Sequence, residues 1–400
     1  MLKFKRFVFS LLMATVGWMA SHAQISLSLS DSARISLLTC SPGGSVEELF
    51  GHTAYRIEDP ASGLDLIVNY GLFSFDQPHF IARFVKGETD YMCGPNSPKW
   101  FLRQYRERGS SVTQRQLRLT PAQRDCLYST LITNMMPENA TYRYNFIFNN
   151  CATKPRDLTE QCLAGGLHYA FADPTQESEI SFRDAIKEYT QTASWAQFGF
   201  DLCLGAGTDR KATFHELLFL PEKLQEAYAS AVISGETGNQ PLVMATTELT
   251  PRTRTDQNLP VGPHLLFWSL LATVMLISVW GYRKRRPLIG LDALLFTAGA
   301  LAGSIVFFLV FFSEHPFTDH NFNLWCLNPL MLWPLLSLCI PPLRRWDWVF
   351  YGLWAISTAL YLIAFAFVPQ DMHTAMLPIA GMYLCRATSR CMLHFRQQVG

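Results

Sequence analysis

The chain has 400 residues, more than one compact core usually needs, so we expect two or three structural units. Its net charge of +1, from 33 Lys and Arg against 32 Asp and Glu, argues against a dedicated nucleic-acid binder, whose basic surface usually shows in the charge sum. Only 16% of the residues are charged whereas 49% are hydrophobic and 13% aromatic, which indicates that part of the chain lies in a membrane.

The first 23 residues have the pattern of a secretory signal peptide. Basic residues within 1–6 precede an apolar run over 7–20, and Ser21-His22-Ala23 forms a small-x-small cleavage site. An uncleaved anchor is the alternative, although the run is short for a membrane span. In either case the following sequence is exported, and we expect an exported domain over residues 24–234.

The exported domain opens with segments typical of antiparallel strands. Residues 34–40 predict a buried strand, 47–50 a helical turn, and 51–57 a second strand in which polar and apolar residues alternate. Alternation places His52 on one face of the second strand and Tyr55 on the other, which makes Tyr55 a core residue. A third strand over 64–70 ends with Asn69 and Tyr70, which are candidates for lining a pocket, with packing as the alternative.

A cysteine lies at the predicted start of a helix. The strand-like segment 142–148 leads to Asn149, Asn150 and Cys151, and a helical pattern over 154–163 follows. The positive end of a helix and its unpaired N–H groups lower a thiol pKa and stabilise an oxyanion. His52 on a neighbouring strand would then be the base. Spacing alone leaves open that His52 is a strand-edge residue and Cys151 a small buried one.

Neighbours of Cys151 are candidates for supporting roles. Asn149 or Asn150 could orient His52 or donate to an oxyanion, and capping the helix is the alternative. Arg156 and Asp157 could support the site, and a surface ion pair is the alternative.

Six cysteines lie in the exported domain, and their irregular spacing includes no CxxC. This excludes the usual zinc-site pattern and leaves any disulfide pairing open. The six are Cys40, Cys93, Cys126, Cys151, Cys162 and Cys203. A catalytic Cys151 predicts that Cys151→Ser abolishes activity while Cys126→Ser changes it little.

Residues 235–263, rich in Pro and Thr, resemble a linker, and 264–400 predict a five-helix transmembrane domain. Nine Lys or Arg residues follow the first and third spans or lie in or after the fifth, whereas residues 313–323 and 369–372 contain none. The positive-inside rule therefore places those two loops and the exported domain on the non-cytoplasmic side. The predicted spans are His264–Tyr282, Ile289–Phe312, Leu324–Pro341, Trp348–Val368 and a segment that begins near Met372.

The outer loop over 313–323 is dense in polar side chains. His315, Asp319, Asn321 and Asn323 are candidates for binding a lipid headgroup or an incoming amine, with helix capping as an alternative. Two histidines and an acid within this loop invite a metal site, but their spacing is irregular, so we expect neither a metal nor a cofactor.

Four strings of the exported domain resemble the Bacteroidetes family of Lnb-type lipoprotein N-acyltransferases. They are FGHTAYRIED (50–59), NYGLFSF (69–75), FVKGETDYMCG (84–94) and YRYNFIFNNCATKPRD (142–157). More distantly, a histidine that precedes an Asn-Cys pair is similar to circularly permuted papain-like enzymes, including NlpC/P60 members and lecithin:retinol acyltransferase relatives.

The resemblance implies an α+β, circularly permuted papain-like (NlpC/P60-like) exported domain on the periplasmic side of a bacterial inner membrane. It implies that Cys151 takes an acyl chain from a membrane phospholipid as a thioester and passes it to the α-amine of a diacylated lipoprotein. The alternatives are a cell-wall amidase or peptidase, a phospholipase, and a non-enzymatic envelope scaffold. Five spans favour a lipid substrate, because a cell-wall hydrolase needs at most one anchor.

Overall fold

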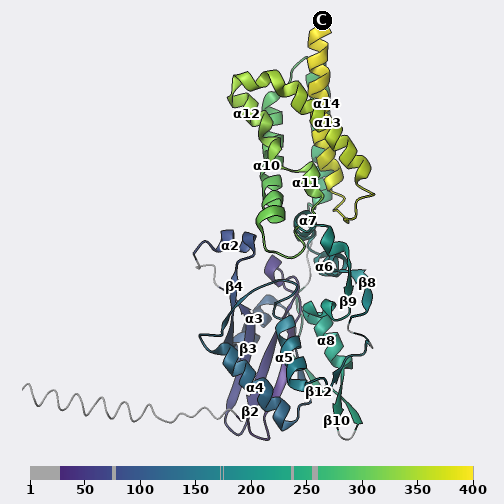
Figure 1. The fold of residues 1–400 in the computed structure, drawn as a ribbon. Coiled ribbons are helices and arrows are strands. Elements are labelled where there is room, and N and C mark those ends of the chain that lie inside the picture. Colours follow the sequence, from purple (N-terminus) through teal and green to yellow (C-terminus); the bar gives the residue numbers. More distant parts are fainter. Residues whose placement is uncertain are drawn as a thin grey trace, which may run out of the picture.

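The computed structural model describes residues 28–73, 78–171, 173, 175–235, 238–254 and 260–399. The predicted signal peptide, residues 1–23, lies outside these ranges. The described residues form an α+β domain and a helical bundle that follow one another along the long axis of the molecule (Figure 1).

Seven antiparallel strands form the main sheet of the α+β domain, in the order β12-β5-β1-β2-β3-β4-β6. The first three strands agree to within two residues with the predicted segments 34–40, 51–57 and 64–70. The strands are β1 (Arg34–Cys40), β2 (His52–Asp59), β3 (Leu64–Leu72), β4 (Asp90–Asn96), β5 (Val112–Leu117), β6 (Thr141–Arg143) and β12 (Val243–Thr250).

Two small sheets and a set of helices complete this domain. The sheets are β11 (Gly238–Pro241), β10 (Val232–Gly235) and β7 (Leu167–His168), and β8 (Glu177–Ser181) with β9 (Lys211–Thr213). The α-helices are α2 (Phe80–Lys86), α3 (Pro98–Arg108), α4 (Pro121–Met135), α5 (Thr153–Leu163), α6 (Phe182–Thr190), α7 (Ser194–Cys203) and α8 (Pro221–Ser230). The 3-10 helices are η1 (Val46–Glu48), η2 (Ala206–Asp209) and η3 (Glu216–Phe219).

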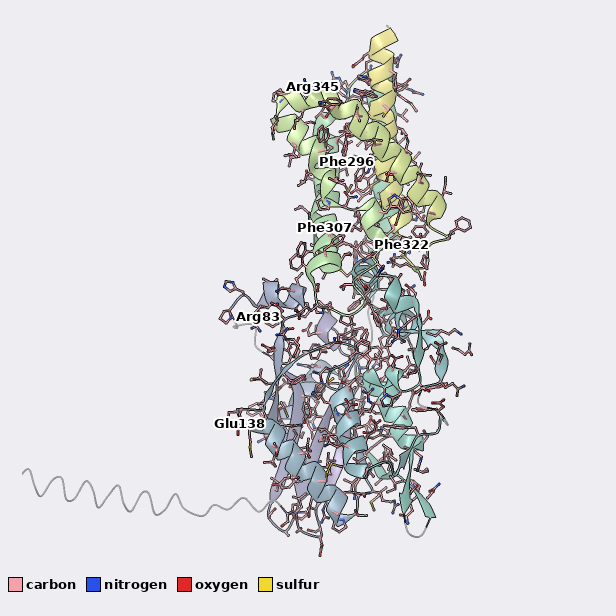
Figure 2. The ribbon with its side chains drawn as sticks, viewed as in Figure 1. Arg83, Glu138, Phe296, Phe307, Phe322 and Arg345 are labelled. Atoms are coloured by element: carbon pink, nitrogen blue, oxygen red, sulfur yellow. A yellow bond between two sulfur atoms is a disulfide. The ribbon has the colours of Figure 1, made fainter. Side chains whose placement is uncertain are left out.

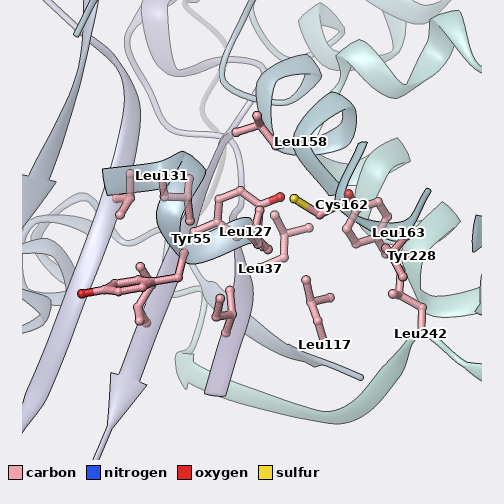
Figure 3. Close-up of a cluster of buried hydrophobic side chains, with 14 of the residues drawn as sticks. Leu37, Tyr55, Leu117, Leu127, Leu131, Leu158, Cys162, Leu163, Tyr228 and Leu242 are labelled. Carbon is pink, nitrogen blue, oxygen red and sulfur yellow. The ribbon is translucent and has the colours of Figure 1, made fainter. Parts of the chain in front are cut away.

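The two faces of the main sheet pack against different helices. Tyr55 and Val68 face the larger core, which α4, α5 and α8 complete with Leu127, Leu158 and Tyr228 (Figure 3). On the other face, Cys40 and Ala54 pack against α3. Tyr55 is fully buried, and its hydroxyl donates to the carbonyl of Pro155 in α5. The alternation of β2 is confirmed, and it directs His52 and Thr53 to opposite faces.

A disulfide between Cys126 and Cys162 joins α4 to α5. Figure 3 shows the sulfur of Cys162 among the leucines of the larger core. The disulfide fixes α5, the helix that follows Cys151, to α4.

The segment predicted as a linker, 235–263, belongs largely to the α+β domain. β11 lies in a small sheet, and β12 pairs with β5 at the edge of the main sheet. Most side chains of β12 are exposed, so the strand has no apolar alternation that would reveal it. Its threonines favour a strand because they are β-branched.

The bundle contains three helices that are long and apolar enough to cross a membrane in the part of the chain described: α9, α10 and the segment Pro341–Ala364. At 24 residues, α14 is long enough at roughly 36 Å, but it is more polar. The helices are α9 (Pro263–Arg283), α10 (Ile289–Phe312), α11 (Asn323–Cys326), η4 (Pro329–Leu332), α12 (Trp333–Cys339), η5 (Pro341–Trp346), α13 (Asp347–Ala364) and α14 (Met376–Val399).

The third predicted span, Leu324–Pro341, is not one helix. Asn328 accepts from the N–H of Leu330, and Pro329 and Pro334 lack the N–H that a continuous helix needs, so the segment divides into α11, η4 and α12. It packs closely on α10 at Gly303, where an added Cβ would lie 2.3 Å from the amide nitrogen of Asn328. Gly303 thus permits two backbones to approach, whereas Gly299, one turn earlier, makes room for the side chains of Met331 and Tyr383.

Two of the arginines that contribute to the positive-inside pattern are inside the bundle. Arg386 of α14 is 1% exposed; it donates to Asp292 of α10 at 2.6 Å and to the hydroxyl of Ser278 in α9. Arg390 lies 3.3 Å from Asp347 at the start of α13. These bonds hold four helices together at the end of the bundle away from the α+β domain (Figure 1).

We predict that replacing Cys126 and Cys162 together by serine destabilises the α+β domain by about 3–4 kcal/mol, because the disulfide closes a loop of 36 residues. Thermal unfolding of the detergent-solubilised chain measures the effect. Cys203→Ser, at a free cysteine, is the control. An unchanged unfolding temperature in the double variant would contradict the pairing.

Candidate active site

His52 begins β2 and contacts a side chain of the adjacent strand. Its Nε2–H donates to Oδ1 of Asn69 in β3 at 2.5 Å. This bond selects the tautomer, because it leaves Nδ1 as the nitrogen that can accept a proton from Cys151. The ring also stacks on Tyr105 of α3, with the ring centroids 6.5 Å apart and the planes at 14°.

Asn150 holds the turn that carries Cys151. Its Oδ1 accepts from the N–H groups of Ala152 and Thr153 at 2.8 and 2.9 Å. Its Nδ2 donates to the carbonyls of Phe146 and Phe219 at 2.7 and 2.9 Å. Both ends of the Asn150 amide are thus hydrogen-bonded within the loop and at the start of α5. This corresponds to the alternative that Asn150 caps the helix. The Thr53 hydroxyl fixes the turn further by donating to the carbonyl of Cys151.

The surroundings of Cys151 favour its thiolate. Burial by itself would raise the pKa of the thiol, but the charge of His52, a hydrogen bond from His52 and hydrogen bonds from Thr53 outweigh burial and lower the pKa. For His52, burial would lower the pKa, and the charge of Cys151 with hydrogen bonds to Cys151 and Asn69 raises it instead. The pair therefore favours thiolate and imidazolium together, the state in which a cysteine attacks a carbonyl carbon.

A backbone donor lies beside the thiol. Within the described residues, the amide N–H of Cys151 donates to no acceptor. Gly71, at the end of β3, has φ of +89°, and a Cβ added there would lie 3.9 Å from the Cβ of Cys151. A carbonyl oxygen bound at this N–H would sit next to the sulfur, as an oxyanion site requires.

Among the predicted orienting residues, only Asn69 contacts His52. Asn149 donates from Nδ2 to the carbonyl of Arg143, and Asn150 is used as described above. Tyr70 points to the opposite face from Asn69, where its hydroxyl accepts from Asn134 at 2.9 Å. The orienting group of the site is thus an amide on a neighbouring strand.

Arg156 and Asp157 form an ion pair at 2.7 Å with each other. Arg156 also donates to the carbonyl of His215, so it ties α5 to the loop before η3. Neither residue contacts His52 or Cys151, and the geometry corresponds to the ion-pair alternative.

Two residues of the site have no sequence motif of their own. Thr53 follows His52 directly, and the alternation of β2 points it toward α5, so a search for partners of Cys151 on that face would have found it. Tyr105 lies on α3 and meets His52 only through the fold. No local pattern indicates this contact.

The membrane-side loop over 313–323 is docked on the α+β domain. His315 Nε2 donates to the carbonyl of Phe84 at 2.6 Å, and the amides of Asn321 and Asn323 donate to the carbonyls of Leu202 and Asp201. Three of the four predicted headgroup or amine ligands are therefore used in docking. Asp319 is 60% exposed and accepts from the adjacent His320.

This docking places the membrane loop against the loop of the cysteine. Phe148, three residues before Cys151, lies with its ring 5.7 Å from that of Phe317 in the membrane loop. Phe182 of α6 contacts Phe317 from another side at 5.1 Å. The thiol thus lies at the end of the α+β domain that faces the bundle. Among the described residues, no group of three His, Cys, Asp or Glu could hold a metal ion.

We predict that Cys151 is alkylated by iodoacetamide at pH values below 9.0, the ordinary pKa of a thiol, because its lowered pKa keeps the thiolate as pH falls. In His52→Ala the opposing effect of burial dominates, so the midpoint of the rate profile moves above 9.0. Asn69→Ala raises the midpoint of the alkylation profile by less than His52→Ala does, and Tyr70→Phe leaves the midpoint unchanged. Mass spectrometry of the labelled peptide measures each profile; equal midpoints for wild type and His52→Ala would refute the ion pair.

Comparison with known families agrees with this arrangement of two units. Residues 26–187 match the model described as the Lnb N-terminal periplasmic domain, and residues 254–398 match that of the Lnb transmembrane domain. No curated protein and no solved structure matches the chain. The two matches fall in the two units of the structure, in the same order, and the chain belongs to the Lnb family of membrane proteins, with its N-terminal domain in the periplasm.

Proposed function

We propose that this protein is a lipoprotein N-acyltransferase that uses Cys151 as its nucleophile. The observation that carries the proposal is the chain of contacts from Cys151 to His52 to Asn69, held at the end of the periplasmic domain that faces the membrane loop. Such a site meets a substrate that is confined to the membrane surface without extracting it into water.

In the first half-reaction, the thiolate of Cys151 attacks the acyl ester carbon of a phospholipid. The negative charge that develops on the carbonyl oxygen is stabilised by the N–H of Cys151. The sulfur–carbon bond forms and the ester carbon–oxygen bond breaks, while the His52 imidazolium gives its proton to the departing oxygen. The products are a thioester on Cys151 and a lysophospholipid.

In the second half-reaction, the free α-amine of a diacylated lipoprotein attacks the thioester. Neutral His52 takes a proton from the amine as the carbon–nitrogen bond forms, and the thiolate of Cys151 leaves. Asn69 holds the ring in the same tautomer in both halves because its Oδ1 accepts the Nε2–H throughout. The cycle ends with the thiolate and imidazolium with which it began.

The same contacts support a permuted papain-like arrangement of the periplasmic domain. His52 and Asn69 come from adjacent strands and precede the cysteine in sequence, and the cysteine begins a helix packed on that sheet. Papain-like enzymes use the same three groups, a base, an orienting amide and a nucleophile. The geometry of these groups matters for the reaction, and their order along the chain does not.

The test is mass spectrometry of the N-terminal peptide of a reporter lipoprotein, from cells that lack their own N-acyltransferase. We predict that the wild type adds one acyl chain to the α-amine. Cys151→Ser and His52→Ala should each lower the rate of N-acylation by about a thousandfold or more, because nucleophile and base act as a unit. Cys203→Ser is the matched control, since Cys126 is held in a disulfide and is not neutral.

Other outcomes separate the alternatives. A free amine together with accumulating lysophospholipid would identify a phospholipase. If neither product forms and Cys151→Ser behaves as the wild type, the acyltransferase proposal fails, and a structural or cell-wall role replaces it.

A further inference from the structure

The short helix α2 presents apolar side chains outward at the junction of the two units. Ile81 is 77% exposed and Phe84 is 45% exposed, whereas Phe80 is buried against the domain. Ile81 and Phe84 lie three positions apart and therefore share one face. Arg83 and Lys86 of the same helix pair with Asp90 and Glu88. An apolar face flanked by basic residues is typical of a helix at a membrane surface.

The membrane loop holds α2 beside the outer end of α10. The N–H of Glu314 donates to the carbonyl of Lys86 at 2.7 Å, and the hydroxyl of Ser313 donates to that of Val85 at 3.0 Å. Arg143 of β6 pairs with Glu314 at 3.2 Å. Figure 1 shows α2 at the side of the molecule, where the periplasmic domain meets the bundle. The helix is thus fixed at the height where α10 leaves the membrane.

The end of α10 that contacts α2 also exposes apolar side chains. Phe307, Phe311 and Phe312, in the last two turns of α10, are 36%, 60% and 57% exposed. Figure 2 shows Phe307 on the same side of the molecule as Arg83 of α2. A membrane-spanning helix exposes such residues to lipid, so the lipid-facing part of α10 extends to the end of the helix that contacts α2.

A row of stacked aromatic rings leads inward from α2. The ring of Phe84 is 6.1 Å from that of Phe80, which is 5.7 Å from Phe73. Phe73 is 4.9 Å from Tyr91, and Tyr91 is 4.1 Å from Tyr144. All four contacts are stacked. We call these five residues the aromatic row.

The inner end of the aromatic row lies near the thiol. Phe73 is two residues beyond Gly71, whose backbone passes Cys151 as described above. Burial raises the pKa of Tyr144, and the charge of Cys151 raises it further, so the two side chains are within electrostatic range of each other. The row therefore runs from the membrane surface to the nucleophile.

We propose that Ile81 and Phe84 of α2 enter the outer leaflet beside α10 and that the aromatic row guides a phospholipid acyl chain from there to Cys151. The second part rests on the proposed function. Apolar side chains at the entry and along the row lower the cost of moving an acyl chain out of the bilayer.

Photo-crosslinking of the full chain tests the membrane contact without any need for catalysis. A benzophenone amino acid replaces Ile81, or Met244 as the control, and the protein is reconstituted in vesicles of phosphatidylethanolamine and phosphatidylglycerol. Met244 is 52% exposed and lies on β12, away from the bundle (Figure 1). We expect a lipid adduct at position 81 and none at position 244. Absence of an adduct at 81 would overturn the proposal.

A second experiment tests delivery of the acyl chain. In the same vesicles, Ile81→Asp with Phe84→Asp should lower the formation of acyl-Cys151 at least tenfold, because carboxylates resist entry into lipid. Alkylation of Cys151 by iodoacetamide should remain as in the wild type, which shows that the site is folded. Met244→Asp is expected to change neither readout.

The two experiments separate the possible failures. Normal acylation in the double variant would overturn the route through α2. If the wild type forms no acyl-Cys151 from phospholipid, the proposed function fails and the route fails with it. The crosslink at position 81 still decides whether α2 contacts the bilayer.

Discussion

The position of the thiol relative to the membrane depends on the docking of one loop, residues 313–323, on the periplasmic domain. The loop is hydrogen-bonded on two sides. Ser313 and Glu314 bond to α2, and Asn321 and Asn323 bond to α7. Backbone carbonyls of the domain accept most of these bonds. Because such groups are costly to bury without a partner, the junction is specific as well as stable.

Arg183 organises the surface that receives the loop. It is 1% exposed, pairs with Asp201 and Asp209 at 2.9 and 2.7 Å, and donates to the carbonyls of Leu204 and Gly205. These bonds set the end of α7 and the start of η2. A buried charge that lost its partners would be strongly destabilising, so this cluster holds the turn in one conformation. Within this turn, the N–H of Gly205 donates to the carbonyl of Phe317 in the membrane loop.

The candidate site around Cys151 is built from hydrogen bonds that restrict motion rather than from an unusual group. Asn150 uses both ends of its amide to fix the turn, Thr53 anchors the carbonyl of Cys151, and Asn69 sets the tautomer of His52. With His52 and Cys151 held in this way, their ion pair forms without further ordering. In the reaction proposed above, such preorganisation would lower the cost of reaching the transition state.

The sequence by itself determined the local features of this protein. The alternation of β2 predicts the faces of His52 and Tyr55, apolar length predicts α9 and α10, and the position of Cys151 before a helical pattern predicts its place at the start of α5. These features depend on residues close together in the chain, and their periods of 2 and 3.6 are visible in the letters. The motifs around His52 and Cys151 also pointed to the family.

Only the tertiary structure decided which distant groups meet. In the fold, Asn69 rather than Asn149 or Asn150 contacts His52. The segment predicted as a linker contains β12, which joins the main sheet. His315, Asn321 and Asn323 dock the membrane loop on the periplasmic domain. The fold also divides the third predicted span, which is mostly apolar, at Asn328, Pro329 and Pro334. A polar side chain carries no sign of its partner in the sequence, because hydrogen bonds are satisfied by whichever donor or acceptor the fold brings within about 3 Å.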